Sequence, residues 1–215
     1  MYKNFKAACF ITAICFILSC LIALPTFASS TDPKEAADGS AGSTPDSSTT
    51  PPPEVKEDPE PEDDESLWHS EKLPLKKEHQ KLLWDHCKKR NLDYIDMLSL
   101  IYLESNFNEK CSSGKYKGYF QISTAHGPNM TKTLKTENKP LDGAININWG
   151  TALYSWILAD KRVRDLEGQA KRDAALSIYQ RGAGGYDKYG LSKSFLKRFY
   201  AKRTIVCSYF DKDTV

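Results

Sequence analysis

The feature that most constrains the fold is an apolar run that ends on a single carboxylate. Met97 to Leu103 is apolar at almost every position, and Glu104 follows it directly. A helix that is apolar all round is a buried helix. Burial and the negative end of the helix dipole both disfavour an anion at this place, so both raise the pKa of the carboxyl group. The run therefore predicts a core helix with a proton donor in its last turn, and an ordinary surface glutamate is the alternative.

The chain begins with a leader of the secretory type. Lys3 and Lys6 precede an uncharged apolar run from Ala7 to Ala28, and this pattern is typical of a signal peptide over residues 1–28. The run is also close to the length of a membrane span, so an uncleaved N-terminal anchor is the alternative. In both cases we expect an exported protein, at the cell surface or extracellular, and tethered to the membrane if the leader is retained.

Residues 29–66 differ in composition from the rest of the chain. Ser, Thr, Pro, Asp and Glu dominate, aromatic residues are absent, and twelve acidic side chains face only two basic ones. Such a segment cannot bury enough surface to offset its ordering entropy, so we expect a solvated tether. Residues 67–215 then carry a net charge of +10, which suits an anionic partner such as a bacterial wall or a lipid surface. No arginine-rich run or basic and aromatic platform favours nucleic acid.

The pattern of residues 67–215 predicts a mainly helical domain. We expect helices over 74–90, over the run that carries Glu104, from Asp142 to about Val163, over 172–180, and over 192–209, with the basic side chains of the last helix forming a solvated face. Asp142 has the character of an N-terminal cap, and Gly182 that of a helix stop. The Ser-, Gly- and Lys-rich stretch 106–117 predicts a loop. A short β-hairpin or turn is expected near Gly118–Ile122.

Three cysteines fall in this part of the chain, so at most one internal disulfide can form. We favour Cys87 with Cys207, because both lie in helical patterns near the ends of the domain, and the pairing stays open. His86 beside Cys87 lacks the spacing of a metal site, so we expect no metal and no cofactor.

Four blocks of sequence then carry a resemblance to a known family. Glu104-Ser105-Asn106-Phe107 and Gly118-Tyr119-Phe120-Gln121-Ile122 resemble the E-S-x-F and G-L-M-Q-I blocks of the soluble lytic transglycosylases. Asn146-Ile147-Asn148-Trp149-Gly150 resembles N-I-x-x-G, and Ile178-Tyr179-Gln180-Arg181-Gly182 resembles A-Y-N-x-G. The blocks fall in the family order between residues 75 and about 205.

The resemblance implies a fold and an activity. These enzymes are lysozyme-like helical proteins, related to goose-type lysozyme, that cut peptidoglycan glycan strands between N-acetylmuramic acid and N-acetylglucosamine. Glu104 would act as acid and then as base, forming a 1,6-anhydro end without water. The expected partner is the glycan strand. A membrane at the N-terminal segment and a secretion or conjugation machine are further partners to consider.

The same resemblance assigns roles to four side chains. Tyr179 matches a tyrosine whose hydroxyl hydrogen-bonds the catalytic acid, and Gln121 matches a glutamine that holds a sugar ring through its amide. Ser112 corresponds to a contact with an N-acetyl group, and Ser123 to a groove-lining position usually filled by methionine. Taken alone, each of these side chains would be an ordinary core or loop residue.

Two departures from the family pattern concern the groove. Gln180 keeps the amide of the family asparagine but is longer by one methylene, and Tyr119-Phe120 replaces Leu-Met, which offers an aromatic wall for a sugar to stack on. Two alternatives stay open beside the transglycosylase. One is a hydrolase of the same bond, using Glu109, Glu137, Asp142 or Asp187 to position water. The other is an inactive wall-binding or assembly module.

Overall fold

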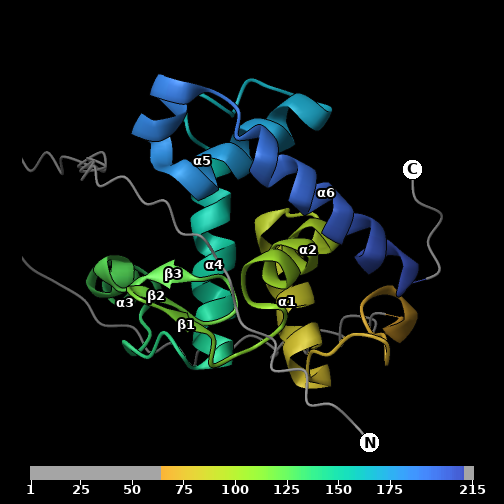
Figure 1. The fold of residues 1–215 in the computed structure, drawn as a ribbon. Coiled ribbons are helices and arrows are strands. Elements are labelled where there is room, and N and C mark those ends of the chain that lie inside the picture. The colour runs from red at the N-terminus through yellow and green to blue at the C-terminus, as the bar shows by residue number, and fades with distance from the viewer. Residues whose placement is uncertain (1–63, 211–215) are drawn as a thin grey trace, which may run out of the picture. The chain divides into compact units, whose positions relative to one another are not determined.

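The computed structural model describes residues 64–210, which form a mainly helical fold with a short antiparallel sheet, as the sequence predicts (Figure 1). The helices of this part of the chain are α1 (Lys77–Arg90), α2 (Tyr94–Ser105), α3 (Gly127–Leu134), α4 (Gly143–Leu158), α5 (Gly168–Tyr189) and α6 (Lys193–Ser208). None of them is both long and apolar enough to cross a bilayer. The predicted leader, 1–28, lies outside the described residues, and so does the predicted tether up to residue 63.

Helix α2 lies in the core, as the apolar run predicts. Met97, Leu98, Leu100 and Ile101 expose none of their surface. The Oδ1 atom of Asp93 accepts a hydrogen bond from the backbone N–H of Asp96 at 2.8 Å and caps the helix at its start. The largest neighbour of α2 is α6, so α2 is held by packing as well as by its own hydrogen bonds.

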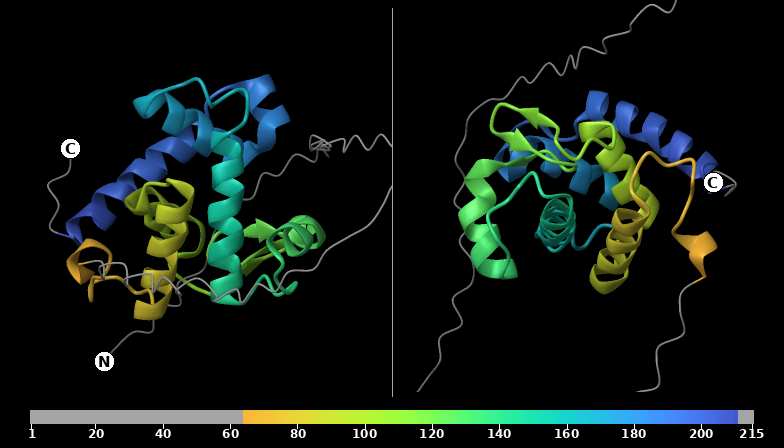
Figure 2. Two further views of the ribbon diagram at one scale, coloured as in Figure 1. Left: turned by 180° about the vertical axis from the view of Figure 1, so that it is seen from behind. Right: turned by 90° about the horizontal axis from the view of Figure 1, so that it is seen from below.

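Helix α4 passes between the other elements, with α1 and α3 on opposite sides of it in the view along its axis (Figure 2). The predicted cap is confirmed, because Asp142 Oδ1 accepts from the Ile145 N–H at 3.0 Å. The helix ends at Leu158 rather than near Val163, since Asp160 begins a new turn that its side chain holds through the N–H of Arg162. Asn146 and Gly150 of α4 shape the candidate site.

The sheet has two strands in the predicted loop 106–117, and its third strand begins at Ile122, where the sequence predicts a short hairpin or turn. Strands β1 (Ser112–Ser113), β2 (Tyr116–Lys117) and β3 (Ile122–Ser123) pair antiparallel in the order β1-β2-β3. In the register, Ser112 faces Lys117, and Lys117 faces Ile122. Strands this short carry no alternation of apolar and polar residues, which is why composition alone indicates a loop.

Helix α5 is longer than predicted. Its backbone leaves helical geometry at Gly182, with φ 74° and ψ 164°, and becomes helical again beyond it. The predicted stop is therefore a break within a longer helical segment. Glycine suits this position because a positive φ costs it little.

The sequence predicts that the basic side chains of α6 form a solvated face, but not all of them do. Arg203 Nε donates to Oδ1 of Asp96 at 2.8 Å, and Arg172 of α5 donates to Oδ2 of the same carboxylate at 2.5 Å. Asp96 is 4% exposed. The two guanidinium groups therefore neutralise a buried carboxylate and join α2 to α5 and α6.

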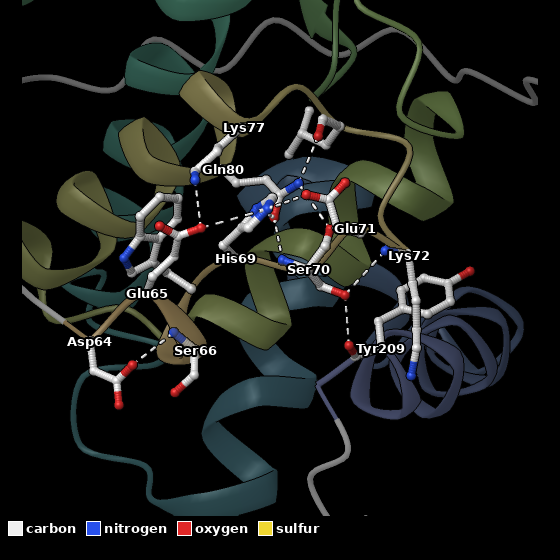
Figure 3. A network of polar contacts seen from close by, with 12 residues as sticks. Asp64, Glu65, Ser66, His69, Ser70, Glu71, Lys72, Lys77, Gln80 and Tyr209 are labelled. Carbon is white, nitrogen blue, oxygen red and sulfur yellow. Dashed lines mark hydrogen bonds and ion pairs between the residues drawn. The ribbon is translucent and has the colours of Figure 1, made fainter.

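A network of polar contacts joins the first described residues to α1 (Figure 3). Asp64 caps the 3-10 helix η1 (Glu65–Leu67), and Glu65 pairs with Lys77 at 2.5 Å. The buried Gln80 side chain accepts from the Ser70 N–H at 3.0 Å and donates to the Leu75 carbonyl at 2.7 Å. Asp64 and Glu65, which the sequence assigns to the end of the tether at residue 66, thus take part in the folded structure.

The favoured disulfide is not present. Cys87 and Cys207 are both buried, and each is a free thiol. Apolar burial raises the pKa of the Cys87 thiol, so this side chain behaves as a small core hydrophobe.

Candidate active site

Glu104 lies in the last turn of α2 and is half-buried. Burial raises the pKa of its carboxyl group to about 7, and the positive charge of Arg198 opposes this effect. The carboxyl makes no hydrogen bond or ion pair with any residue in the described range 64–210. A carboxyl group with this pKa is present in both protonation states near neutral pH, so it can give a proton and take one back.

The backbone turns sharply just beyond this carboxyl group. Asn106 and Phe107 both have positive φ, 53° and 60°, so the helix is ended by two successive left-handed residues. A bulky side chain rarely adopts this conformation, and the Phe107 ring is held there by stacking on Tyr102 with 5.1 Å between ring centroids. Packing over α2 therefore fixes the exit of the chain and, with it, the last turn that carries Glu104.

Tyr179 of α5 is a neighbour of Glu104. Burial raises the pKa of the Tyr179 phenol, and the charge of Glu104 is the next cause of that shift. The hydroxyl group donates to the backbone carbonyl of Phe120, so the expected donation to the acid is not formed. The phenol oxygen keeps lone pairs that can accept a hydrogen bond from Glu104 when the carboxyl group is protonated.

Gln121 stands in the turn between β2 and β3 and has φ 45°. Its amide nitrogen donates to the carbonyl of Gly118 at 2.8 Å and to that of Cys111 at 3.1 Å. Both N–H groups are therefore used to hold the turn, whereas the family resemblance assigns the amide to a sugar ring. The Oε1 atom is the part of this side chain that can still accept a hydrogen bond from a ligand.

Asn146 of α4 supports the same turn, and sequence reasoning gave it no role. Its side chain accepts from the Phe120 N–H at 2.9 Å and donates to the carbonyls of Lys117 at 3.0 Å and Pro140 at 2.8 Å. A Cβ atom at Gly118 would lie 2.4 Å from the Asn146 amide nitrogen, so only glycine allows this approach. A buried asparagine between two isoleucines was the available signal in the sequence.

The Phe120 side chain is not a stacking wall for a sugar, because it is fully buried. Its ring lies against Gly150, where an added Cβ would come within 2.2 Å of the ring. Tyr119 is buried too, and its hydroxyl lies 2.9 Å from Nδ1 of His79. The aromatic pair was expected to line the groove, but both rings pack into the core because α4 provides Gly150 opposite Phe120 and Gly143 opposite Tyr119.

Three further expected residues contact protein groups rather than converge on Glu104. The exposed Ser112 Oγ accepts from Lys117 Nζ at 2.5 Å, and Ser123 is buried and caps the 3-10 helix η2 (Thr124–His126). Gln180 is exposed, and its Oε1 accepts from Ser192 Oγ at 3.0 Å. The structure thus brings Tyr179 beside the acid and joins Tyr179 to the Gln121 turn through the Phe120 carbonyl. It leaves the other three with local contacts of their own.

A shallow depression of about 400 Å³ lies elsewhere, and its lining comprises Lys110, Lys117, Lys139, Pro140, Leu141 and Asp142. None of the residues grouped around Glu104 lines it. Lys110 already binds Glu109 and the Leu141 carbonyl, and Lys117 binds Ser112. The candidate site is therefore defined by the chemistry around the acid and not by this hollow.

Within residues 64–210, no three His, Cys, Asp or Glu side chains converge as a metal site would require. No family model matches the chain, and no curated protein matches it.

Proposed function

We propose that this chain is a lytic transglycosylase that cuts peptidoglycan glycan strands at the β-1,4 bond between N-acetylmuramic acid and N-acetylglucosamine. The observation that carries the proposal is the carboxyl group of Glu104, half-buried at the end of a core helix, with a pKa of about 7 and with Tyr179 beside it. The four ordered sequence blocks around this pair support the same conclusion. The enzyme would act outside the membrane, on the wall at the cell surface.

In the proposed first step, protonated Glu104 gives its proton to the glycosidic oxygen as the bond from that oxygen to C1 breaks. The N-acetylglucosamine leaves with a 4-hydroxyl group. The N-acetyl carbonyl of the muramic acid can stabilise the positive charge at C1, so no second protein carboxylate is required.

In the second step, ionised Glu104 takes the proton of the 6-hydroxyl group of the same sugar, and O6 bonds to C1. The product ends in a 1,6-anhydro ring, Glu104 is protonated again, and no water is consumed. A pKa near 7 suits this sequence because the same group must serve as acid and then as base.

The contacts of the other carboxylates favour this mechanism over hydrolysis. Glu109 binds Lys76, Lys110 and the Gly143 N–H, and these contacts lower its pKa to about 2. Asp187 pairs with Arg162 at 2.6 Å, and Glu137 pairs with Lys139 at 2.6 Å. Asp142 caps α4. None of them is a cause of the raised pKa of Glu104, so no direct pairing with the acid supports the hydrolase alternative.

The deciding experiment incubates the purified full chain with peptidoglycan and identifies the released ends by mass spectrometry. Anhydro ends support the proposal, and reducing ends would replace it with a hydrolase. Wall binding without release would indicate a binding or assembly module. The Glu104→Gln variant should release nothing and keep its fold by circular dichroism, whereas Glu167→Gln, an exposed carboxylate without a side-chain contact, should release fragments at the wild-type rate.

A further inference from the structure

Helices α2 and α6 run antiparallel beside each other. Arg203 of α6 binds Asp96 near the start of α2, and Lys202 lies over the ring of Tyr102 near its end. On α6, Arg198 lies one helical turn before Lys202. On α2, Glu104 lies two residues after Tyr102. The antiparallel course therefore brings the Arg198 end of α6 to the turn that carries the acid.

Lys202 is held in place by an aromatic ring rather than by a carboxylate. Its Nζ atom lies 3.7 Å from the centroid of the Tyr102 ring, and that ring stacks on Phe107 directly beyond Glu104. A contact of this kind orients an ammonium group without neutralising its charge. No described carboxylate forms an ion pair with Lys202, so its N–H donors remain available.

Arg198 is exposed and also lacks a carboxylate partner within residues 64–210. Its guanidinium group lies 5.8 Å from the Phe195 ring centroid, and its charge is the one that acts on the carboxyl of Glu104. Arg203, by contrast, is neutralised by Asp96. Arg198 and Lys202, which have no carboxylate partner among the described residues, thus both lie at the end of α2 that carries Glu104.

We propose that Arg198 and Lys202 bind a carboxylate of the glycan substrate next to Glu104, so that the enzyme selects anionic over neutral strands. This inference rests on the proposed function. A guanidinium group binds a carboxylate through two parallel hydrogen bonds, and a neighbouring ammonium adds a third charged donor. A strand of N-acetylglucosamine alone offers no such group.

Two kinds of wall carboxylate have this chemistry. In a strand without peptides, the lactyl group of muramic acid ends in a free carboxylate. In a strand with peptides, that group is consumed as an amide, and the carboxylates belong to the stem. Comparing peptide-free glycan, intact wall and wall with chemically amidated carboxyl groups separates the two sources.

The test measures binding and cleavage on these three substrates. Binding is measured with the Glu104→Gln variant, alone and combined with Arg198→Gln and Lys202→Gln. We expect the two substitutions to weaken binding to carboxylate-bearing glycan by about tenfold, the loss typical of a charge-assisted contact, and to leave binding to amidated wall unchanged. In the active enzyme the same substitutions should raise KM more than they lower kcat. Arg198→Lys should retain part of the preference.

Lys193→Gln combined with Lys197→Gln is the matched control, because both lysines are exposed on the same helix and the variant loses the same two charges. An equal loss in this variant would show that net charge alone is responsible and would overturn the inference. If amidation of the wall leaves the affinity of the wild-type binding surface unchanged, the inference is overturned as well. If the active enzyme releases no fragments, the proposed function fails, and the binding comparison still decides whether α6 recognises carboxylates.

Discussion

The side chain of Asn146 holds the backbone of Phe120. Its Oδ1 atom accepts from the Phe120 N–H at 2.9 Å, and its amide nitrogen donates to two more backbone carbonyls. The Phe120 carbonyl in turn accepts from the hydroxyl of Tyr179, the neighbour of Glu104. A buried asparagine on α4 thus positions, through one backbone segment, the phenol beside the acid.

We therefore expect Asn146→Ala to destabilise the protein by about 2–4 kcal/mol, because it leaves one donor and two acceptors unsatisfied at a fully buried position. Urea unfolding measures the change. Asn129→Ala, at an exposed position of α3, should change the free energy of unfolding by less than about 0.5 kcal/mol. Equal stability of the Asn146 variant and wild type would show that the turn does not depend on α4.

Features set by neighbouring residues could be predicted from the sequence. The buried α2 follows from a continuous apolar run, and the start of α4 follows from Asp142, whose side chain reaches an N–H only three residues away. The proximity of Glu104 and Tyr179 was expected through the family resemblance alone. No periodicity or spacing in the chain indicates it.

Features that depend on distant partners could not be predicted. Phe120 turns inward because Gly150, thirty residues later, leaves room for its ring, and Gln121 uses its amide on its own turn. Arg203 looks like part of a solvated basic face until Asp96 is placed beside it. In each case a tertiary contact decides between two conformations that are equally acceptable locally.

The raised pKa of Glu104 makes stability depend on pH in a direction unusual for a carboxylate. Between its ordinary pKa of 4.5 and the native value of about 7, the folded protein binds more protons than the unfolded chain, so this group lowers stability as pH rises through that window. Glu104→Gln should therefore be more stable than wild type at pH 8 by on the order of 3 kcal/mol and nearly equal at pH 4. Urea unfolding at both pH values tests this. A constant difference between the proteins would contradict it.

Arg198 should hold the pKa of Glu104 below the value that burial alone would give. Its positive charge is the cause that opposes burial, and the other group whose pKa is linked to Glu104 is the neutral phenol of Tyr179. Arg198→Gln should raise the pKa of Glu104, seen in the carboxyl carbon NMR signal of a glutamate-labelled protein. Cleavage should then persist to higher pH. Lys197→Gln should leave the pKa of Glu104 unchanged. An unchanged pKa in the Arg198 variant would contradict the claim that the charge of Arg198 lowers it.

The Gln80 side chain should be a main contributor to the docking of the first described residues. It is 1% exposed and joins the backbone of Ser70 and Leu75 to α1. Gln80→Ala should lower the free energy of unfolding by about 2–3 kcal/mol, because backbone groups lose their partners. Proteolysis near residue 70 should also become faster. An unchanged cleavage rate would show that this segment is held by its other contacts, among them Ser70 Oγ to the Tyr209 carbonyl at 2.7 Å.

The buried carboxylate of Asp96 gives the sharpest test of how α2 is held against α5 and α6. Asp96→Ala leaves the half-buried Arg172 and Arg203 with only the more distant Asp93, at 3.8 and 3.9 Å, so we expect a loss of about 3–5 kcal/mol. Asp165→Ala, which removes an exposed carboxylate 3.3 Å from Arg164, should cost less than about 1 kcal/mol. Added salt should reduce the small effect and leave most of the large one, since buried pairs are poorly screened. Equal losses in the two variants would mean that apolar packing alone sets the position of α2, and with it that of Glu104.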